Sequence, residues 1–477
     1  MKKGLLLVGT LLMSSVLFGQ SAYDALSYCN TNPVLGTARY SAMAGAFGAF
    51  GGNASTTKDN PAGVGIYKQF DLTFTPELNI DNDKNAGFSL ANFGLVINFR
   101  NHKEREKGYI TSSLGISYNR LRNFSRYTAV ADLSNTGLSL SDRMVDKVAP
   151  NVIFENARGL GLIGTSDTPN ENGSYNYESK FGLNSSIDKV TRYSESGHVG
   201  QWDFTYGVNI SNRVYVGGGM GVASIQYSIK DKYDETTFDD NQDQFYLDNY
   251  YQAEGVGVNF KLGVIAKVTD FFRLGFAIHT PTFYNIDESY SVEMDYNNQY
   301  PTEPQIDYAD YNYDLQSPFK MQVSAGFVIA KRALIGIQYD MENYNTMRMS
   351  KDDMKYEDEE TIIKRDFKNT HMIRLGAEVK VIPEFALRVG YAYQSSLTND
   401  INDYSQYMYL FRSLSLPRSS HFITAGLGYE GEHFYCDLAY VFRNQKTVLY
   451  SMVPQVDSEW NLNLKNHDLL LSLGWRF

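Results

Sequence analysis

Apolar and polar residues alternate over runs of about ten residues in many parts of the chain. In the last nine residues, 469–477, one face of an extended strand carries three leucines, Trp475 and Phe477, and the other face is mostly small or polar. Residues 256–264 and 385–393 repeat the pattern. A closed barrel in a bilayer needs strands of this length, with an apolar face toward lipid and a polar face toward the lumen. The pattern therefore predicts an all-β fold, a transmembrane antiparallel β-barrel.

Charged residues lie opposite the apolar positions of several predicted strands. An Arg or Lys side chain that faces lipid near the middle of the membrane costs roughly 2–4 kcal/mol, so we expect these charges to face the lumen. They are Lys261, Lys320, Arg374, Glu378, Lys380, Arg388, Asp437 and Arg476. Their orientation fixes the register of each strand.

Connections between the predicted strands alternate between tight turns and long polar stretches. The tight turns lie at 211–212, 269–270, 331–332, 383–384 and 431–432. The long stretches lie at 230–249, 293–310, 350–361, 397–419 and 451–466. Outer-membrane barrels have short periplasmic turns and long extracellular loops, so the alternation gives every strand a direction. Counting from Phe70 predicts about fourteen strands, an even number that places both ends of the barrel on the periplasmic side.

The first residues have the features of a secretory signal peptide. Lys2 and Lys3 precede an apolar segment, 5–18, that is too short to span a membrane and is followed by small residues. We therefore expect a signal peptide over residues 1–20, with cleavage between Gly19 and Ala22. The mature chain is then exported from the cytoplasm.

Composition narrows the class of protein further. After the signal peptide the sequence has no run of about eighteen apolar residues, and the mean hydropathy is -0.35, so any spanning is done by strands. The 36 Tyr and 28 Phe suit aromatic girdles at two membrane interfaces. A net charge of -11 argues against a nucleic-acid partner. A disulfide between the two cysteines, Cys29 and Cys436, is possible in an exporting compartment but is not expected.

Residues 21–68 differ from the rest of the chain. They are rich in Gly, Ala and Asn, lack long alternation and contain two stretches of small residues, 36–46 and 59–63. Small residues let backbone segments pack closely inside a confined space. We interpret this segment as a plug, or hatch, inside a barrel formed by residues 69–477.

The combination of these features resembles the FadL/TodX family of outer-membrane transport proteins. The features are a signal peptide, a hatch with Gly-Thr-Ala-Arg at 36–39, Asn-Pro-Ala at 60–62 before the first strand, about fourteen strands and a terminal phenylalanine. The resemblance implies that a hydrophobic ligand is captured in a groove of helical extracellular loops and moves into a pocket in the barrel. It also implies that the hatch blocks the straight path and rearranges, and that the ligand leaves sideways beside a distorted third strand.

Three sets of residues take these implied roles. The hatch and gating residues are Arg39, Gly45, Asn60, Pro61 and Ala62. The candidate ligand groove lies in the amphipathic stretch 138–162 after the third strand and comprises Met144, Val148, Phe154, Leu160 and Leu162. The candidate lateral opening is at Asn119 and Arg120, which interrupt the apolar alternation of the third strand, 109–125. The alternative for the stretch 138–162 is that its apolar face packs only on neighbouring loops.

Candidate chemistry adds little to this interpretation. The seven histidines are scattered, and none lies in a Ser/His/Asp or metal-binding pattern. We therefore expect no enzymatic activity, no cofactor and no metal. Ligation of haem iron by a Tyr or His in the lumen stays open, because nothing separates such a residue from the many other tyrosines.

The sequence thus predicts passive transport of hydrophobic small molecules across the outer membrane of a Gram-negative bacterium. Long-chain fatty acids are the leading ligand. The alternatives are uptake of haem or aromatic hydrocarbons, or a structural or adhesin barrel. Expected partners are the hydrophobic ligand, outer-membrane lipid and lipopolysaccharide, and the barrel-assembly machinery, to which the terminal aromatic residue resembles a signal. We expect no nucleic-acid partner and a monomer.

Overall fold

The structure is a computed structural model of the chain. It describes residues 21–81, 85–100, 107–132, 139–145, 151–169, 175–181, 186–237, 243–297, 303–351, 354–400, 413–450 and 459–477. The predicted signal peptide, residues 1–20, lies outside the described residues, and so does Val148 of the predicted groove.

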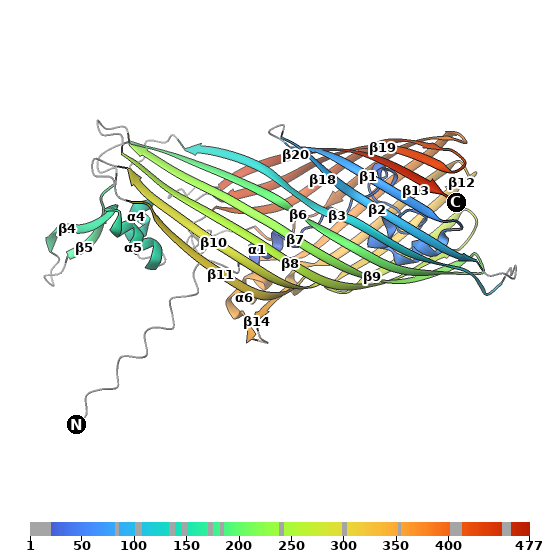
Figure 1. Ribbon diagram of the computed structural model, residues 1–477, viewed down its shortest axis with the longest axis horizontal. Helices are drawn as coiled ribbons and strands as arrows, with labels where there is room; N and C mark the ends of the chain where they lie inside the picture. Colours follow the sequence, from blue (N-terminus) through green and yellow to red (C-terminus); the bar gives the residue numbers. More distant parts are fainter. Residues whose placement is uncertain are drawn as a thin grey trace, which may run out of the picture.

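Four short helices precede the first strand. They are α1 (Ala22–Cys29), α2 (Ala38–Ala42), α3 (Thr56–Asp59) and the 3-10 helix η1 (Pro61–Ile66). The side chains of Ser21 and Thr37 cap α1 and α2 by accepting hydrogen bonds from backbone amides. Figure 1 shows these helices, in blue, inside the barrel. We call residues 21–68 the hatch segment.

The barrel wall is one antiparallel sheet that closes on itself, because β20 pairs with β1. Its strands are β1 (Asp71–Ile80), β2 (Ala86–Arg100), β3 (Tyr109–Asp132), β6 (Ile187–Ile210), β7 (Val214–Thr237), β8 (Gln244–Lys267), β9 (Phe272–His279), β10 (Phe283–Asn297), β11 (Gln305–Gln316), β12 (Lys320–Ile329), β13 (Ala333–Asn343), β14 (Arg348–Lys351), β15 (Met354–Lys355), β16 (Asn369–Ile382), β17 (Phe385–Gln394), β18 (Leu414–Glu430), β19 (Phe434–Tyr450) and β20 (Glu459–Arg476).

Three pairs of consecutive strands each form one longer strand of the wall. β9 continues as β10, β11 as β12 and β13 as β14, and Pro281 and Pro318 lie in the first two interruptions. Proline has no amide to donate to a ladder, so it suits such breaks. The two-residue β15 pairs with β14. The described residues thus form a closed barrel of fourteen wall strands, which confirms the predicted fold class.

The connection after β3 carries secondary structure of its own. It contains α4 (Leu140–Val145), α5 (Asn151–Gly159) and the hairpin of β4 (Ile163–Pro169) and β5 (Tyr175–Ser179). The helical character predicted for residues 138–162 is therefore confirmed. The 3-10 helix η2 (Tyr344–Thr346) follows β13, and α6 (Glu357–Asp366) precedes β16. Within the described part of the chain, no helix has both the length and the apolar character to cross a membrane.

The barrel closes at the C-terminus. Phe70 donates its amide to the Phe477 carbonyl at 3.0 Å, and Phe477 donates to Phe70 at 3.2 Å. Arg476 reaches the carboxylate of Asp71 at 2.9 Å. The last residue is therefore part of the wall, and these contacts join the two ends of the sheet.

The predicted register is confirmed. On β8, Val256, Phe260 and Leu262 are exposed on the outside, whereas Lys261 is 3% exposed and pairs with Asp203. All eight charges expected in the lumen are buried or partly buried and take part in ion pairs. Charge faces inward because an ion exposed to lipid has no partner and no water.

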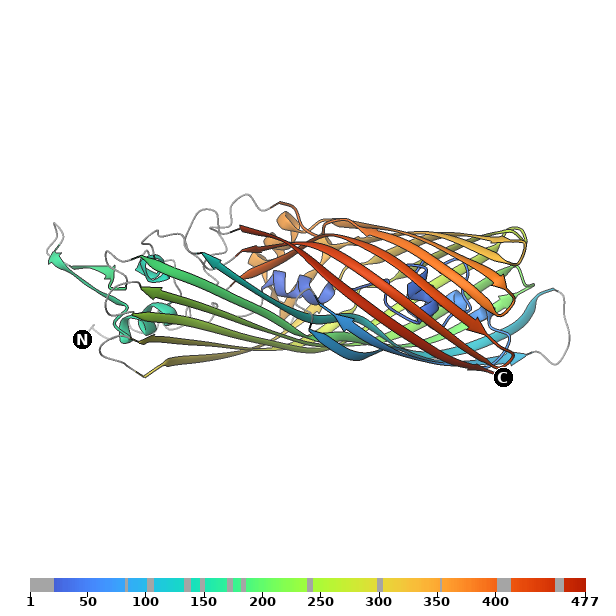
Figure 2. The ribbon, with the colours of Figure 1, turned by 90° about the horizontal axis from the view of Figure 1, so that it is seen from above.

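Two predicted loops, 230–249 and 293–310, are largely strand instead. β7 runs to Thr237, and β8 begins at Gln244, because alternate residues such as Tyr233, Phe245 and Leu247 are buried on the inner face. Polar residues lie on both faces of these strand segments, and Asp231, Glu235 and Asp248 are buried, so the segment resembles a loop in its composition but not in its structure. Figure 2 shows these strands, in green, continuing beyond the red strands β18–β20 at the extracellular end.

The lipid band and the extracellular extension should respond differently to charge. Leu375, on the outer face of β16, is 41% exposed among apolar neighbours, whereas Tyr308, on the outer face of β11, is 77% exposed beside polar strand residues. We expect Leu375→Arg to lower the free energy of unfolding in a bilayer by roughly 2–4 kcal/mol, and Tyr308→Arg by about 0–1 kcal/mol. Denaturant titration of both variants in vesicles measures this. Equal losses would contradict the placement of the membrane.

Candidate functional site

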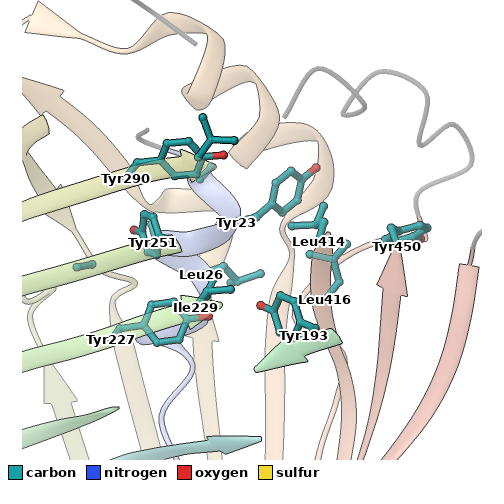
Figure 3. Close-up of a cluster of buried hydrophobic side chains, with 14 of the residues drawn as sticks. Tyr23, Leu26, Tyr193, Tyr227, Ile229, Tyr251, Tyr290, Leu414, Leu416 and Tyr450 are labelled. Atoms are coloured by element: carbon teal, nitrogen blue, oxygen red, sulfur yellow. The ribbon is translucent and has the colours of Figure 1, made fainter. Parts of the chain in front are cut away.

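The extracellular half of the lumen is filled by a cluster of buried apolar side chains around α1. Tyr23 and Leu26 project from α1 into this cluster (Figure 3). The wall contributes Tyr193, Tyr227, Ile229, Tyr251, Tyr290, Leu414, Leu416 and Tyr450. We call this group the α1 cluster. It lies on the extracellular side of the rest of the hatch segment.

Hydrogen bonds to buried carboxylates hold α1 in place. Tyr251 and Tyr313 donate to Glu288 at 2.5 and 2.6 Å, and Tyr28 of α1 reaches the same carboxylate at 3.4 Å. Tyr23 donates to Asp366 of α6 at 2.5 Å. A buried carboxylate needs such donors, since burial without them is costly. The helix is thus fixed to the wall on one side and to α6 on the other.

Glycines of the wall let the hatch backbone lie directly against the strands. A Cβ atom at Gly217 would overlap the backbone of Pro61, and one at Gly376 would overlap that of Met43. The other wall glycines at which a Cβ atom would overlap hatch atoms are Gly94, Gly207, Gly263, Gly275, Gly326, Gly336, Gly390 and Gly426. Side chains at these positions would push the hatch segment out of its place.

A buried ion-pair network joins the hatch segment to β13 and β16. Arg374 donates from Nη1 to Asp59 at 2.9 Å and from Nε to Asp340 at 2.8 Å. A Cβ atom at Gly45, whose φ is +73°, would lie 2.7 Å from Nη1, so glycine leaves room for the guanidinium. Burial raises the pKa of the Asp59 carboxyl, but Arg374 and Lys320 outweigh burial and hold that pKa well below its usual range.

A second network lies nearer the periplasmic end. Arg39 of α2 donates from Nε and Nη2 to both carboxylate oxygens of Glu378, at 2.8 and 2.7 Å. Glu378 also accepts from Arg388 at 2.6 Å, and Arg388 donates to Asp437 at 2.6 Å. Charge-assisted bonds in this forked geometry are among the stronger polar contacts in proteins. Every buried arginine of these two networks has a carboxylate partner.

The motif Asn60, Pro61 and Ala62 forms the turn that begins η1. The Asn60 Oδ1 atom accepts from the Ala62 amide at 3.1 Å, and its Nδ2 donates to the Gly48 carbonyl at 2.8 Å. Pro61 is the first residue of η1, where its missing amide costs nothing. Asn60 Nδ2 also lies 3.3 Å from the Val264 carbonyl on β8. All five predicted hatch residues contact the wall or brace a contact, and their role in gating stays a prediction.

One edge of β3 loses its partner halfway along the strand. The ladder with β2 ends at Asn119, whereas the ladder with β6 continues to Asp132 across a bulge between Arg120 and Arg122. β20 pairs with β1 only as far as His467. Beyond the β1–β2 hairpin, the free edges of β3 and β20 therefore face each other. We call this the β3–β20 gap. The predicted opening at Asn119 and Arg120 lies where it begins.

A cavity of about 250 Å³ occupies the β3–β20 gap. Residues 122–129 of β3 and residues between 462 and 468 of β20 line it with both faces of each strand, as expected between two strand edges. The hatch segment contributes Ser27, Asn32 and Leu35 to its inner side. The cavity thus touches the hatch on one side and the open part of the wall on the other.

The hatch segment itself covers the free edge of β3. The Asn32 amide donates to the Leu121 carbonyl at 2.6 Å, and Arg122 donates from Nη1 to the Asn30 carbonyl at 2.6 Å. The carbonyl of the residue after Asn32 lies 3.4 Å from Nη1 of Arg374, at the edge of the buried network. One short loop therefore links the ion pairs of the hatch to the gap in the wall. Sequence reasoning missed this contact, because it depends on a bulge that alternation does not reveal.

The predicted groove residues lie in or beside the apolar core of the extracellular half. Met144, Leu160 and Leu162 are buried in the same core as the α1 cluster, and Phe154 is partly buried against it and packs edge-on on a ring of β5 at 5.1 Å. The protein itself covers the apolar face of α4 and α5. Their role as a ligand groove stays a prediction.

No curated protein matches the chain. Solved structures do match it over almost the whole length. A FadL homologue from Pseudomonas aeruginosa has a TM-score of 0.55 and 11% identity, covering 93% of this chain and 98% of that chain. The Pseudomonas putida toluene transporter TodX has a TM-score of 0.52 and 10% identity, covering 92% and 98%. The CymD monoaromatic hydrocarbon channel has a TM-score of 0.52 and 11% identity, covering 94% and 98%.

At such low identity these structures show the fold alone. The family is shown by a family model, described as outer membrane protein transport protein (OMPP1/FadL/TodX), which matches residues 167–467. This match spans more than half of the chain. The chain therefore belongs to the OMPP1/FadL/TodX family of outer-membrane proteins of Gram-negative bacteria, which transport hydrophobic compounds.

Proposed function

We propose that this protein takes up hydrophobic small molecules passively, with long-chain fatty acids as the leading ligand. The ligand is captured on the extracellular side, the hatch segment rearranges, and the ligand leaves sideways through the β3–β20 gap. The observation that carries this proposal is the cavity in the gap, which contacts both the hatch and two free strand edges. A ligand in this cavity lies between the free edges of β3 and β20, through which it can leave the barrel sideways.

The filled axis of the barrel supports a lateral route. The α1 cluster occupies the extracellular half, and the networks around Arg374 and Arg39 cross the lumen below it. An axial route would break several buried charge-assisted bonds, and leaving a buried charge unpaired costs roughly 3–5 kcal/mol. A lateral route needs only the loop at Asn30 and Asn32 to leave the edge of β3.

The hatch segment, residues 21–68, acts as the gate in this proposal, after removal of residues 1–20. Arg39, Gly45, Asn60, Pro61 and Ala62 hold it against the wall. Its movement and the opening of the gap are coupled, because the loop that covers β3 also contacts Arg374. Met144, Val148, Phe154, Leu160 and Leu162 take part in capture, for which α4 and α5 separate from the core of the extracellular half.

Monoaromatic hydrocarbons are a second candidate ligand. A volume of about 250 Å³ is small for a ligand pocket, since such pockets usually span roughly 300–1,000 Å³. Two of the similar structures are a toluene transporter and a monoaromatic hydrocarbon channel. Comparing uptake of radiolabelled oleate and toluene by cells that produce the protein separates the two candidates.

Filling the cavity should block transport and spare assembly. Leu464 on β20 lines the cavity, whereas Leu471 on the same strand is 39% exposed on the outer face. We expect Leu464→Trp to lower oleate uptake at least about five-fold, because the larger ring occupies the space the ligand needs. Leu471→Trp is the matched control. Both variants should give a heat-modifiable barrel on gels, and normal uptake by Leu464→Trp would contradict the lateral route.

The turn at Pro61 should matter for gating more than for assembly. Pro61→Gly frees the backbone angle that starts η1, and we expect weaker anchoring of the hatch and oleate uptake reduced by about half or more. Pro169→Gly in the exposed strand β4 makes the same chemical change away from the hatch. Uptake and heat-modifiability are measured together for both. An assembled Pro61→Gly barrel with full uptake would remove this turn from the gate.

A further inference from the structure

Two buried arginines in the cavity lack a carboxylate partner. Arg122 on β3 and Arg443 on β19 are 9% and 8% exposed, and both line the cavity. Among the described residues, no hydrogen-bond partner meets Nε or Nη2 of Arg443 or Nε of Arg122. Arg122 donates from Nη1 to the Asn30 carbonyl at 2.6 Å. Burying an ionised group without a direct partner is expensive, so such a group requires an explanation, of which ligand binding is one.

The contrast with the other lumenal arginines is informative. Arg39, Arg374 and Arg388 each contact a carboxylate at 2.9 Å or less. These three arginines, which hold the hatch segment or the wall, therefore have counter-charges. Within the described residues neither Arg122 nor Arg443 has such a direct contact, although Glu195 attracts Arg122 and Asp468 attracts Arg443 electrostatically.

The remaining charges of the cavity do not neutralise this pair. Arg126 forms an ion pair with Glu195 at 3.4 Å and donates a hydrogen bond to the Ser415 hydroxyl at 2.8 Å. Asp468 attracts Arg443, but its carboxylate is hydrogen-bonded by the Asn79 amide. Arg122 and Arg443 also repel each other electrostatically. Asp81 and Lys465 complete the charged lining and carry opposite signs.

We propose that Arg122 and Arg443 bind the anionic head group, a carboxylate or a phosphate, of a ligand whose apolar tail lies along Phe124, Leu462 and Leu464. The inference rests on the proposed function, since it names the chemical class of ligand for the same cavity. A guanidinium offers several donors in a planar fork, which suits both kinds of oxyanion. The apolar residues lie on the facing strands β3 and β20, so the tail extends toward the open wall.

Ligand binding at this site also affects the hatch segment, because Arg122 contacts both. Arg122 donates to the Asn30 carbonyl in the loop that covers the edge of β3. An anion bound between the two arginines competes for this guanidinium and weakens its bond to the loop. Ligand binding and release of the β3 edge are then linked through one side chain.

The test compares charged and neutral ligands on the full chain purified in detergent. Probes are radiolabelled oleate, methyl oleate and hexadecyl phosphate. We expect Arg443→Gln and Arg122→Gln to weaken oleate binding about 10- to 100-fold, as for the loss of charge-assisted hydrogen bonds, and methyl oleate binding less than about two-fold. Arg443→Lys should retain more affinity than Arg443→Gln. Lys446→Gln, on the outer face of β19, removes the same charge outside the cavity and should bind like the wild type.

Stability gives a second readout. Because Arg443 is buried without a carboxylate partner, Arg443→Gln should melt at the same temperature as the wild type or higher, whereas Arg388→Gln should melt lower. Equal weakening of oleate and methyl oleate, or no weakening of either, would overturn the head-group site. Binding of hexadecyl phosphate with the same arginine dependence assigns the site to anionic head groups in general, and binding of oleate alone assigns it to carboxylates.

Failure of the proposed function gives a different result. If the wild type carries neither oleate nor methyl oleate, or if Leu464→Trp carries both normally, the lateral route itself is wrong. If the wild type carries both ligands through a route that Leu464→Trp blocks, but binds them with equal affinity, only the head-group site is wrong.

Discussion

Direct contact between the hatch backbone and the glycines of the wall is the constraint on which the rest of the structure depends. Because a Cβ atom at Gly217 or Gly376 would overlap the hatch, the segment can lie deep enough for Asp59 to reach Arg374 and for Arg39 to reach Glu378. The charges that the strands must turn away from lipid thereby gain partners. A barrel without this contact would hold several unpaired ions in its lumen.

The same packing explains how the wall tolerates an incomplete ladder. A strand edge at membrane depth leaves amide and carbonyl groups without partners, and each costs several kcal/mol in a dry environment. At the start of the β3–β20 gap, the Asn32 amide satisfies the Leu121 carbonyl. The hatch segment is therefore a part of the wall as well as its plug. Movement of the loop at Asn32 uncovers an edge that only this loop covers, within the described residues.

The alternation of apolar and polar residues was enough to predict the barrel and the inward charges, because lipid penalises every error of register in the same way. The strand directions were predicted from the short and long connections between strands. The alternation of apolar and polar residues was a poor guide outside the membrane, where the outer face of a strand does not contact lipid. Residues 230–249 look like a loop, but Tyr233 and Phe245 continue the strands above the membrane by packing on an inner core. The sequence predicts a lateral opening at Asn119 because this residue breaks the alternation of β3, whereas Arg122 follows a bulge that shifts the register. Arg443 follows the alternation of β19, but no pattern reveals that a buried arginine lacks a partner.

The chemistry of the ligand bears on the choice of route. Burying one methylene gains about 0.8 kcal/mol, so a tail of about fifteen methylenes gains roughly 12 kcal/mol when it moves from water into an apolar medium. A ligand that left axially would lose this gain in the periplasm, after breaking the bonds of Arg374 and Arg39 on the way. A ligand that leaves through the β3–β20 gap can keep its tail against Phe124, Leu462 and Leu464 until it reaches the outside of the wall. The transfer of the head group is then the demanding step, and Arg122 and Arg443 lie where that step begins.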